Sequence, residues 1–246
     1  MLAIALILAA LIGLSLGLLG SGGSIITVPV LVYVARVSPH QAVGMSLFIV
    51  GATSTLGAAV NVRRGSFNLR AAFFFALSGI AGAWLGARLT HRVPGRVLLL
   101  LFGVLMLIAG GRMLLGRPLH SGASACRPLR CLGVGGGVGL LTGFLGVGGG
   151  FLILPALVLF AGLEMKVAVG TSLAVIATNS FAGLLGQLHF VTFDWPLTLA
   201  FVGSAVLGMA AGLGLNKRVS SRDLARAFAG IILLLGVFLI LRNSLW

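Results

Sequence analysis

Long apolar runs separated by short polar gaps divide the chain into ten segments. In the first half they span about residues 2–19, 24–36, 41–60, 71–88 and 97–115, and in the second half about 131–145, 150–162, 167–188, 196–215 and 224–241. Few charged residues interrupt these runs, and most of the runs approach the length of a membrane-spanning helix. The pattern therefore predicts an all-α polytopic membrane protein.

The second segment of each half is shorter than a membrane span. About 13 residues of helix rise roughly 20 Å, at about 1.5 Å per residue, whereas the hydrocarbon core of a bilayer is about 30 Å thick. We expect 24–36 and 150–162 to be broken or re-entrant helices, next to about four full helices in each half.

A glycine-rich run precedes each short segment, and the two runs match. GLLGSGGSIITVPVLV begins at Gly17 and GFLGVGGGFLILPALV begins at Gly143, an offset of 126 residues. At that offset, 14 of the first 31 positions are identical, and AVGMSL at 42–47 aligns with AVGTSL at 168–173. Similarity at a fixed offset indicates an internal repeat. The predicted units are a first transmembrane repeat at 1–115, a cytoplasmic linker at 116–130 and a second transmembrane repeat at 131–246.

The composition supports a membrane location. Hydrophobic residues make up 59% of the chain, charged residues 8%, and the mean hydropathy is +1.18, whereas a soluble domain carries about 25% charged residues. A net charge of +14 in a soluble protein would indicate nucleic-acid binding. Here the basic residues lie in the gaps between apolar segments, where they set topology and contact anionic lipid. We expect no nucleic-acid partner.

The basic residues also distinguish two topologies. If each short segment continues the preceding helix, the repeats are parallel, and the two sides carry eight and nine Lys and Arg residues. If the chain reverses at each glycine run, the repeats are inverted and the sides carry twelve and five. Because membrane proteins concentrate Lys and Arg in cytoplasmic loops, we predict inverted repeats with both termini on the outer face.

The glycine runs can serve close helix packing or ligand binding. Most of the 38 glycines are assigned to packing, since small residues let membrane helices approach closely. For the two five-residue clusters we favour binding, because irregular backbone at membrane depth must be buried in protein or line a cavity. The free N–H groups at a helix N-terminus attract anions. The predicted substrate-binding residues of these clusters are Gly20, Ser21, Gly22, Gly23, Ser24, Gly146, Gly148, Gly149 and Gly150.

Polar side chains inside the apolar segments are few. Ser46, Thr171 and Ser172 follow the AVG tripeptide of each repeat and are candidates to line the site. Hydrogen bonds to their own helix backbone are the alternative for these hydroxyl groups. Asn179, about two turns further on, is a further candidate because a buried amide must find partners. Thr53, Ser54, Thr55 and Ser180 lie at a similar level but are not assigned to the site.

Acidic residues are nearly absent. The only carboxylates are Glu164, Asp194 and Asp223, none of which lies in the middle of an apolar segment. Transporters of cations, and proton antiporters with a carboxylate relay, normally need one there, so the sequence predicts a small anionic substrate, without a metal or a cofactor. GLSLG at 13–17 matches a hydrolase motif by its letters but lies in an apolar helix. We therefore expect no catalytic residue and no enzyme.

The paired glycine–proline runs, each followed by AVGMSL or AVGTSL, resemble the duplicated signature of the TauE/SafE sulfite exporter family over nearly the whole chain. The resemblance implies a multi-pass secondary transporter of the cell inner membrane that moves small sulfur-containing anions such as sulfite or sulfonates. We interpret the chain as a permease that works by alternating access at a site between the two repeats. A passive anion channel and a non-transporting membrane protein that assembles with a partner stay open as alternatives, as does a homo-oligomer.

Overall fold

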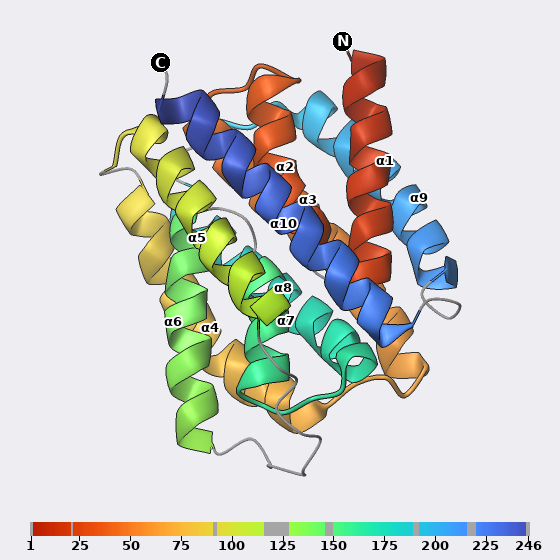
Figure 1. Ribbon diagram of the computed structural model, residues 1–246. Coiled ribbons are helices and arrows are strands. Elements are labelled where there is room, and N and C mark those ends of the chain that lie inside the picture. Colours follow the sequence, from red (N-terminus) through yellow and green to blue (C-terminus); the bar gives the residue numbers. More distant parts are fainter. Residues whose placement is uncertain are drawn as a thin grey trace.

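A computed structural model describes residues 2–20, 22–90, 93–115, 128–145, 150–188, 192–215 and 220–244 (Figure 1). Every regular element within these ranges is a helix, so the predicted all-α fold is confirmed there. The helices are α1 (Leu2–Leu19), α2 (Gly22–Tyr33), α3 (Pro39–Arg63), α4 (Leu69–Thr90), α5 (Gly95–Leu115), α6 (Pro128–Leu145), α7 (Gly150–Leu159), α8 (Met165–Gln187), α9 (Trp195–Leu215) and α10 (Ser221–Ser244). Helix α6 thus begins inside the segment predicted as a linker, most of which lies outside the described residues.

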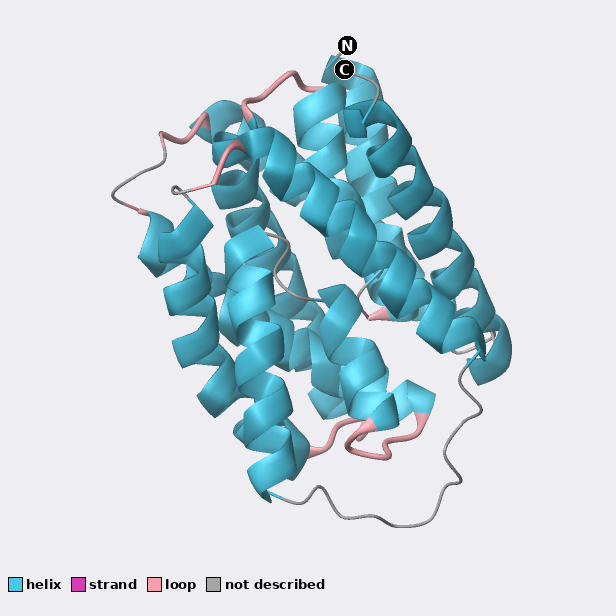
Figure 2. Cartoon of the chain, turned by 60° about the vertical axis from the view of Figure 1, so that its left-hand side comes forward, coloured by secondary structure: helices cyan, strands magenta, loops and turns pink. Residues whose placement is uncertain are grey.

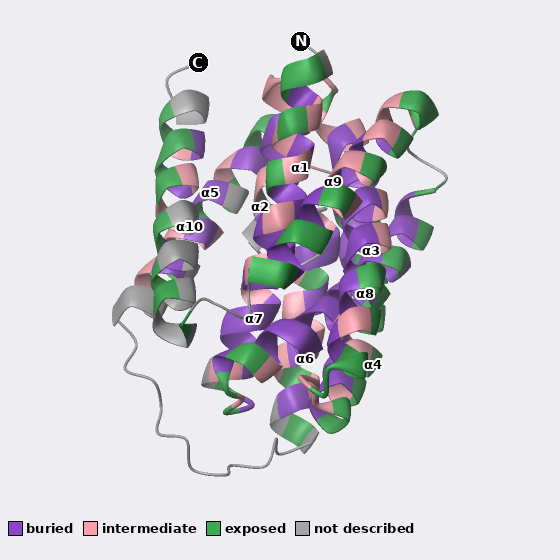
Figure 3. Ribbon diagram, turned by 90° about the vertical axis from the view of Figure 1, so that its right-hand side faces the viewer, coloured by how far each residue is buried: buried purple, intermediate pink, exposed green. Residues whose placement is uncertain are grey.

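Helix length and burial fit a membrane protein. By length and composition α3, α4, α8 and α9 can each cross a membrane, whereas α2 has 12 residues and α7 has 10. Helices α3 and α8 are mostly buried, and the outward faces of the peripheral helices carry large exposed hydrophobic side chains such as Phe73 and Leu77 (Figure 3). An apolar surface of this kind is suited to contact with lipid tails.

The chain reverses direction at the first glycine run. Gly20 follows α1 with a φ of +69°, a left-handed conformation that costs glycine little. Gly23, at the start of α2, lies so close to Ile12 and Leu16 of α1 that a Cβ atom there would overlap the Ile12 carbonyl group. Helix α2 therefore runs back along α1.

Helices of the two halves interlock. Helix α1 packs along α9, α4 along α6, α3 along α8 and α5 along α10. The Cβ position of Gly183 lies against Leu47 and that of Gly57 against Leu173, so α3 and α8 run antiparallel. Because α3 and α8 occupy equivalent places in the sequence repeat, their antiparallel packing supports the inverted arrangement, which stays a prediction. Both chain ends lie at the same end of the bundle (Figure 2).

Glycine residues set the close approach of these helix pairs. A Cβ atom at Gly13 would overlap the backbone of α9 at Ala205, and one at Gly208 would overlap the backbone of α1 at Ala10. The same holds between α4 and α6, where Gly143 faces Ala83. These contacts are the small-residue packing typical of membrane helices, and they account for glycines outside the two clusters.

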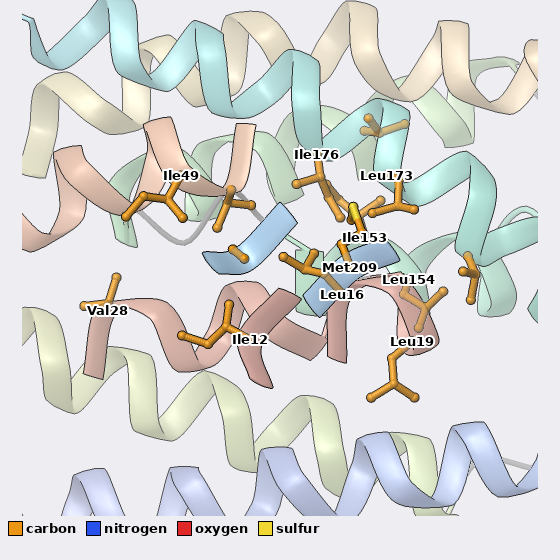
Figure 4. Close-up of a cluster of buried hydrophobic side chains, with 14 of the residues drawn as sticks. Ile12, Leu16, Leu19, Val28, Ile49, Ile153, Leu154, Leu173, Ile176 and Met209 are labelled. Atoms are coloured by element: carbon orange, nitrogen blue, oxygen red, sulfur yellow. The ribbon is translucent and has the colours of Figure 1, made fainter. Parts of the chain in front are cut away.

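One apolar core joins both halves (Figure 4). It includes Leu16 and Leu19 near the end of α1, Ile153 and Leu154 of α7, and Leu173 of α8. Helix α7 packs mainly along α8 and also contacts α2, α5 and α6, so the short helix of the second half meets helices of both halves in the interior of the bundle. This core holds the two helices that begin at glycine clusters inside the protein rather than at its surface.

Candidate functional site

The first glycine cluster lies against the N-terminal part of α8. The Ser172 hydroxyl donates to two carbonyl oxygens, that of Val169 in its own helix at 2.9 Å and that of Gly20 at 3.2 Å. A Cβ atom on Gly20 would lie only 2.7 Å from a side-chain carbon of Val169. The structure thus brings together two predicted site residues, Gly20 and Ser172, from opposite halves of the chain.

Gly23 and Ser24 of this cluster are buried. Gly22 is the first residue of α2, Ser24 is fully buried, and the Thr27 hydroxyl donates to the Gly23 carbonyl oxygen at 3.1 Å. Ser21 lies outside the described residues. The N-terminus of α2 is therefore enclosed by protein, which is the environment that irregular backbone requires at membrane depth.

Most of the second glycine cluster lies outside the described residues, namely Gly146, Gly148 and Gly149, and Gly150 is the first residue of α7. The helix that leads into this cluster is described. Thr90 of α4 donates to the Phe144 carbonyl oxygen at 2.8 Å, and the Gln187 Nε2 atom lies 3.5 Å from the Thr90 hydroxyl. The Thr90 hydroxyl of α4 thus caps the C-terminal end of α6 and is itself contacted by a side chain of α8.

Sequence reasoning did not select Thr90 and Gln187. Both are fully buried, and the Gln187 Oε1 atom has no hydrogen-bond partner among the described residues. One feature of the sequence could have indicated Gln187. It is a glutamine at the end of an apolar helix, at the position that Asn61 occupies in the first repeat. Their contact across 97 residues could not be inferred from either residue alone.

Two of the predicted hydroxyl residues bond to nearby backbone. Ser46 of α3 is fully buried and donates to the Val43 carbonyl oxygen at 3.0 Å. Thr171 donates to Val167 at 2.7 Å and accepts from the Asn68 N–H at 3.0 Å. Thr171 therefore holds the loop between α3 and α4, and no contact with Gly20 is seen for it.

Asn179 lies in the interior without a partner. It is 1% exposed, and its amide oxygen and nitrogen lie 2.5 and 2.6 Å from the Cβ position of Gly79 on α4, so only glycine leaves room for them. Neither amide atom has a hydrogen-bond partner among the described residues. Asn179 lies seven positions after Ser172, or about 10 Å along the helix, so Asn179 is placed apart from the Gly20 contact.

The interior is polar at several points but carries no buried charge in the part of the chain that the structure describes. The buried polar side chains are hydroxyls and amides, which are neutral hydrogen-bond donors and acceptors. Arg64, by contrast, is exposed and donates to the Leu213 carbonyl oxygen at 2.9 Å, where it caps α9. Within the same ranges, no group of three or more His, Cys, Asp and Glu side chains could hold a metal ion.

Two loops connect the halves at the ends of the α3–α8 pair. We name the contacts of residues 192–195 with α3 the 192–195 latch: Gln41 donates to the Thr192 hydroxyl at 2.8 Å, and the rings of Phe48 and Trp195 pack edge to face. We name the contacts of residues 66–68 with the start of α8 the 66–68 latch, which includes the Asn68–Thr171 hydrogen bond. Because α3 and α8 are antiparallel, the two latches lie at opposite ends of the pair.

Comparison with known proteins gives consistent matches over almost the whole chain. The family model described as sulfite exporter TauE/SafE matches residues 5–239. A probable membrane transporter protein of Xylella fastidiosa (strain 9a5c) is 36% identical over 241 residues, which cover 95% of this chain and 92% of that protein. The probable membrane transporter protein YunE of Bacillus subtilis is 25% identical over 249 residues, covering 91% of each chain. No solved structure gives a significant match.

Proposed function

The chain belongs to the TauE/SafE sulfite exporter family and is a multi-pass membrane transporter, and from this premise we propose that it is a secondary transporter of small sulfur-containing anions such as sulfite or sulfonates. The substrate would bind between the two halves and cross by alternating access. The observation that carries the proposal is the hydrogen bond between Ser172 and Gly20, which joins the glycine cluster of one half to a helix of the other inside the bundle.

The chemistry of the interior suits an anion. Helix α2 begins at Gly22 and α7 at Gly150, and the unpaired N–H groups of a helix N-terminus favour negative charge, as in other transporters with broken helices. The buried side chains of the described residues include hydroxyl and amide donors and no carboxylate. An anion entering this interior would therefore meet donors without like-charge repulsion.

The two latches provide a physical route to alternating access. Each latch joins a loop of one half to a helix of the other, and the latches lie at opposite ends of the α3–α8 pair. Opening one while the other stays closed would expose the interior to one side only, which is the motion expected of transporters built from repeats. Basic loops on the cytoplasmic side would contact anionic lipid in the cell inner membrane.

Other functions remain as alternatives with distinct outcomes. A passive anion channel would show flux without accumulation or exchange, and an assembly protein would retain a stoichiometric partner without any flux. An enzyme based on the GLSLG run is disfavoured, because Ser15 lies inside α1 rather than at a strand-to-helix turn. Self-association into a homo-oligomer is compatible with each of these functions.

Uptake of labelled sulfite into proteoliposomes tests the proposed site. We expect Gly22→Leu and Gly148→Leu each to reduce the rate by at least about tenfold, because bulky side chains would block a close approach to the backbone. Gly203→Leu is the matched control, since nothing lies within 4 Å of the Cβ position of Gly203. Unchanged uptake in both cluster variants would overturn the assignment of the site.

A further inference from the structure

Two buried serines lie on the packed helices α3 and α8, and Asn179, the residue before Ser180, faces Gly79 of α4. Ser54 and Ser180 are fully buried, Asn179 is 1% exposed, and none of their polar side-chain atoms has a hydrogen-bond partner among the described residues. The Ser180 Cβ atom lies 3.2 Å from the Cβ position of Gly51, one helical turn before Ser54. Ser54 and Ser180 are also equivalent positions of the two repeats, 126 residues apart.

Neighbouring hydroxyl groups in the same helices are satisfied by their own backbone. The Thr53 hydroxyl donates to Ile49 at 2.7 Å, that of Thr55 to Gly51 at 2.8 Å, and that of Thr178 to Val175 at 3.0 Å. Serine can make the same bond in a helix. At Ser54 and Ser180 it is not made, so the two hydroxyls stay free for another partner.

Leaving these groups unpaired is costly for a structure that gains nothing from them. Two hydroxyls and one carboxamide supply four donor hydrogens, and each buried polar group without a partner costs about 1–3 kcal/mol. Native proteins keep few such groups, so three on the packed helices α3 and α8 need a reason. A ligand that accepts hydrogen bonds from several sides supplies that reason.

The charge of that ligand follows from the absence of a buried countercharge. No Lys, Arg or His is among the buried residues that the structure describes. The cost of moving an ion out of water rises with the square of its charge, so a dianion costs about four times as much as a monoanion of the same size. Neutral donors can compensate the smaller of these costs far better than the larger one.

We propose that Ser54, Asn179 and Ser180 form a central binding site that selects anions carrying a single negative charge. This inference rests on the proposed function and specifies its substrate: hydrogen sulfite and monosulfonates are accepted, and dianions such as sulfate are excluded. The Oδ1 atom of Asn179 accepts a hydrogen bond from the acidic proton of hydrogen sulfite. Opening of either latch lets α3 and α8 separate and gives the anion access to the three side chains.

Anion selectivity of the wild-type chain in proteoliposomes tests the charge rule. The probes are labelled methanesulfonate, a monoanion at every pH used, sulfate, a dianion at every pH used, and sulfite, which loses its second proton near neutral pH. We expect methanesulfonate uptake that is independent of pH, sulfate uptake at least about 100-fold slower, and sulfite uptake that falls as its monoanion is depleted. Sulfate uptake as fast as that of methanesulfonate would overturn the inference.

Substitutions test the assignment of residues. We expect Ser54→Ala/Ser180→Ala and Asn179→Ala each to raise the KM for sulfite by at least about tenfold, since hydrogen bonds to charged groups are the strong ones. Thr53→Val is the matched control, because Thr53 is equivalent to Asn179 in the first repeat and bonds its own helix; its KM should stay within about twofold. An unchanged KM in both site variants contradicts the assignment, whereas a lack of uptake of every anion by the wild-type chain overturns the proposed function itself.

Discussion

The Ser172 hydroxyl donates a hydrogen bond to the Gly20 carbonyl oxygen, 3.2 Å away, although 152 residues separate the two positions. Gly20 follows the last turn of α1, where a helix leaves carbonyl groups without intrahelical partners. Ser172 therefore ties the point at which the chain reverses to α8 of the other half. Any motion of one half against the other that separates α1 from α8 must therefore break this hydrogen bond.

Removing the Ser172 hydroxyl should destabilise the protein. In Ser172→Ala the Gly20 carbonyl oxygen, which is buried, loses this donor, and we expect a loss of about 1–3 kcal/mol in unfolding free energy. Thr178→Val is the control, because the Thr178 hydroxyl bonds only backbone of its own helix, and its effect should stay below about 0.5 kcal/mol. Denaturant titration in detergent measures both, and equal effects would show that the contact is not stabilising.

Gly20→Ala should lower the free energy of unfolding much more than Gly65→Ala does. Both glycines have positive φ, +69° and +71°, so each substitution carries the same backbone cost of about 1–2 kcal/mol. Nothing lies within 4 Å of the Cβ position of Gly65, whereas that of Gly20 overlaps Val169. We expect Gly20→Ala to lose at least about 1–3 kcal/mol more than Gly65→Ala, as measured by the same titration. A difference of zero would place Gly20 away from α8.

Asn179→Leu should reduce transport without reducing the stability of the protein. The substitution has a similar shape and removes two buried polar atoms without partners, so the melting temperature should hold or rise while sulfite uptake falls by at least about tenfold. Thermal unfolding and uptake are measured on the same preparation. Loss of stability with normal uptake would make Asn179 a structural residue.

Fixing the 192–195 latch should stop transport. The Gln41 and Thr192 side chains are 2.8 Å apart at their polar atoms, so Gln41→Cys/Thr192→Cys is placed for a short, cleavable cross-linker. We expect uptake to fall by at least about tenfold on cross-linking and to recover on cleavage, because a closed end blocks alternating access. The two single-cysteine variants, treated identically, are the controls, and full activity of the cross-linked protein would rule out a gate at this end.

Much of the fold could be predicted because hydrophobic pattern and helix length decide it. The apolar runs gave the helices to within a few residues, and the length of the run after Gly20 was enough to predict a short helix, observed as Gly22–Tyr33. The reversal at Gly20 followed from the distribution of Lys and Arg and is now seen in the contact of Gly23 with Ile12. Hydrophobic pattern, segment length and the distribution of basic residues were enough to predict the helices and the reversal.

The candidate site was less predictable because side-chain partners depend on tertiary packing. Nothing in the sequence indicates that Thr171 binds the loop at Asn68 while its neighbour Ser172 binds Gly20. The missing partners of Ser54 and Ser180 are likewise visible only once α3 and α8 are packed together. Adjacent residues on a helix point about 100° apart. The side chains of Thr171 and Ser172 therefore reach different partners, although the two residues are neighbours in the sequence.

Counterflow of labelled sulfite tests the central claim most directly. Proteoliposomes are loaded with a high concentration of unlabelled sulfite and diluted into a trace of labelled sulfite. A carrier that alternates access exchanges the two, so the label should rise transiently inside to well above its outside concentration. Simple equilibration of the label, with no transient excess, would contradict alternating access and identify a channel, and no entry of label beyond that of protein-free liposomes would contradict sulfite transport altogether.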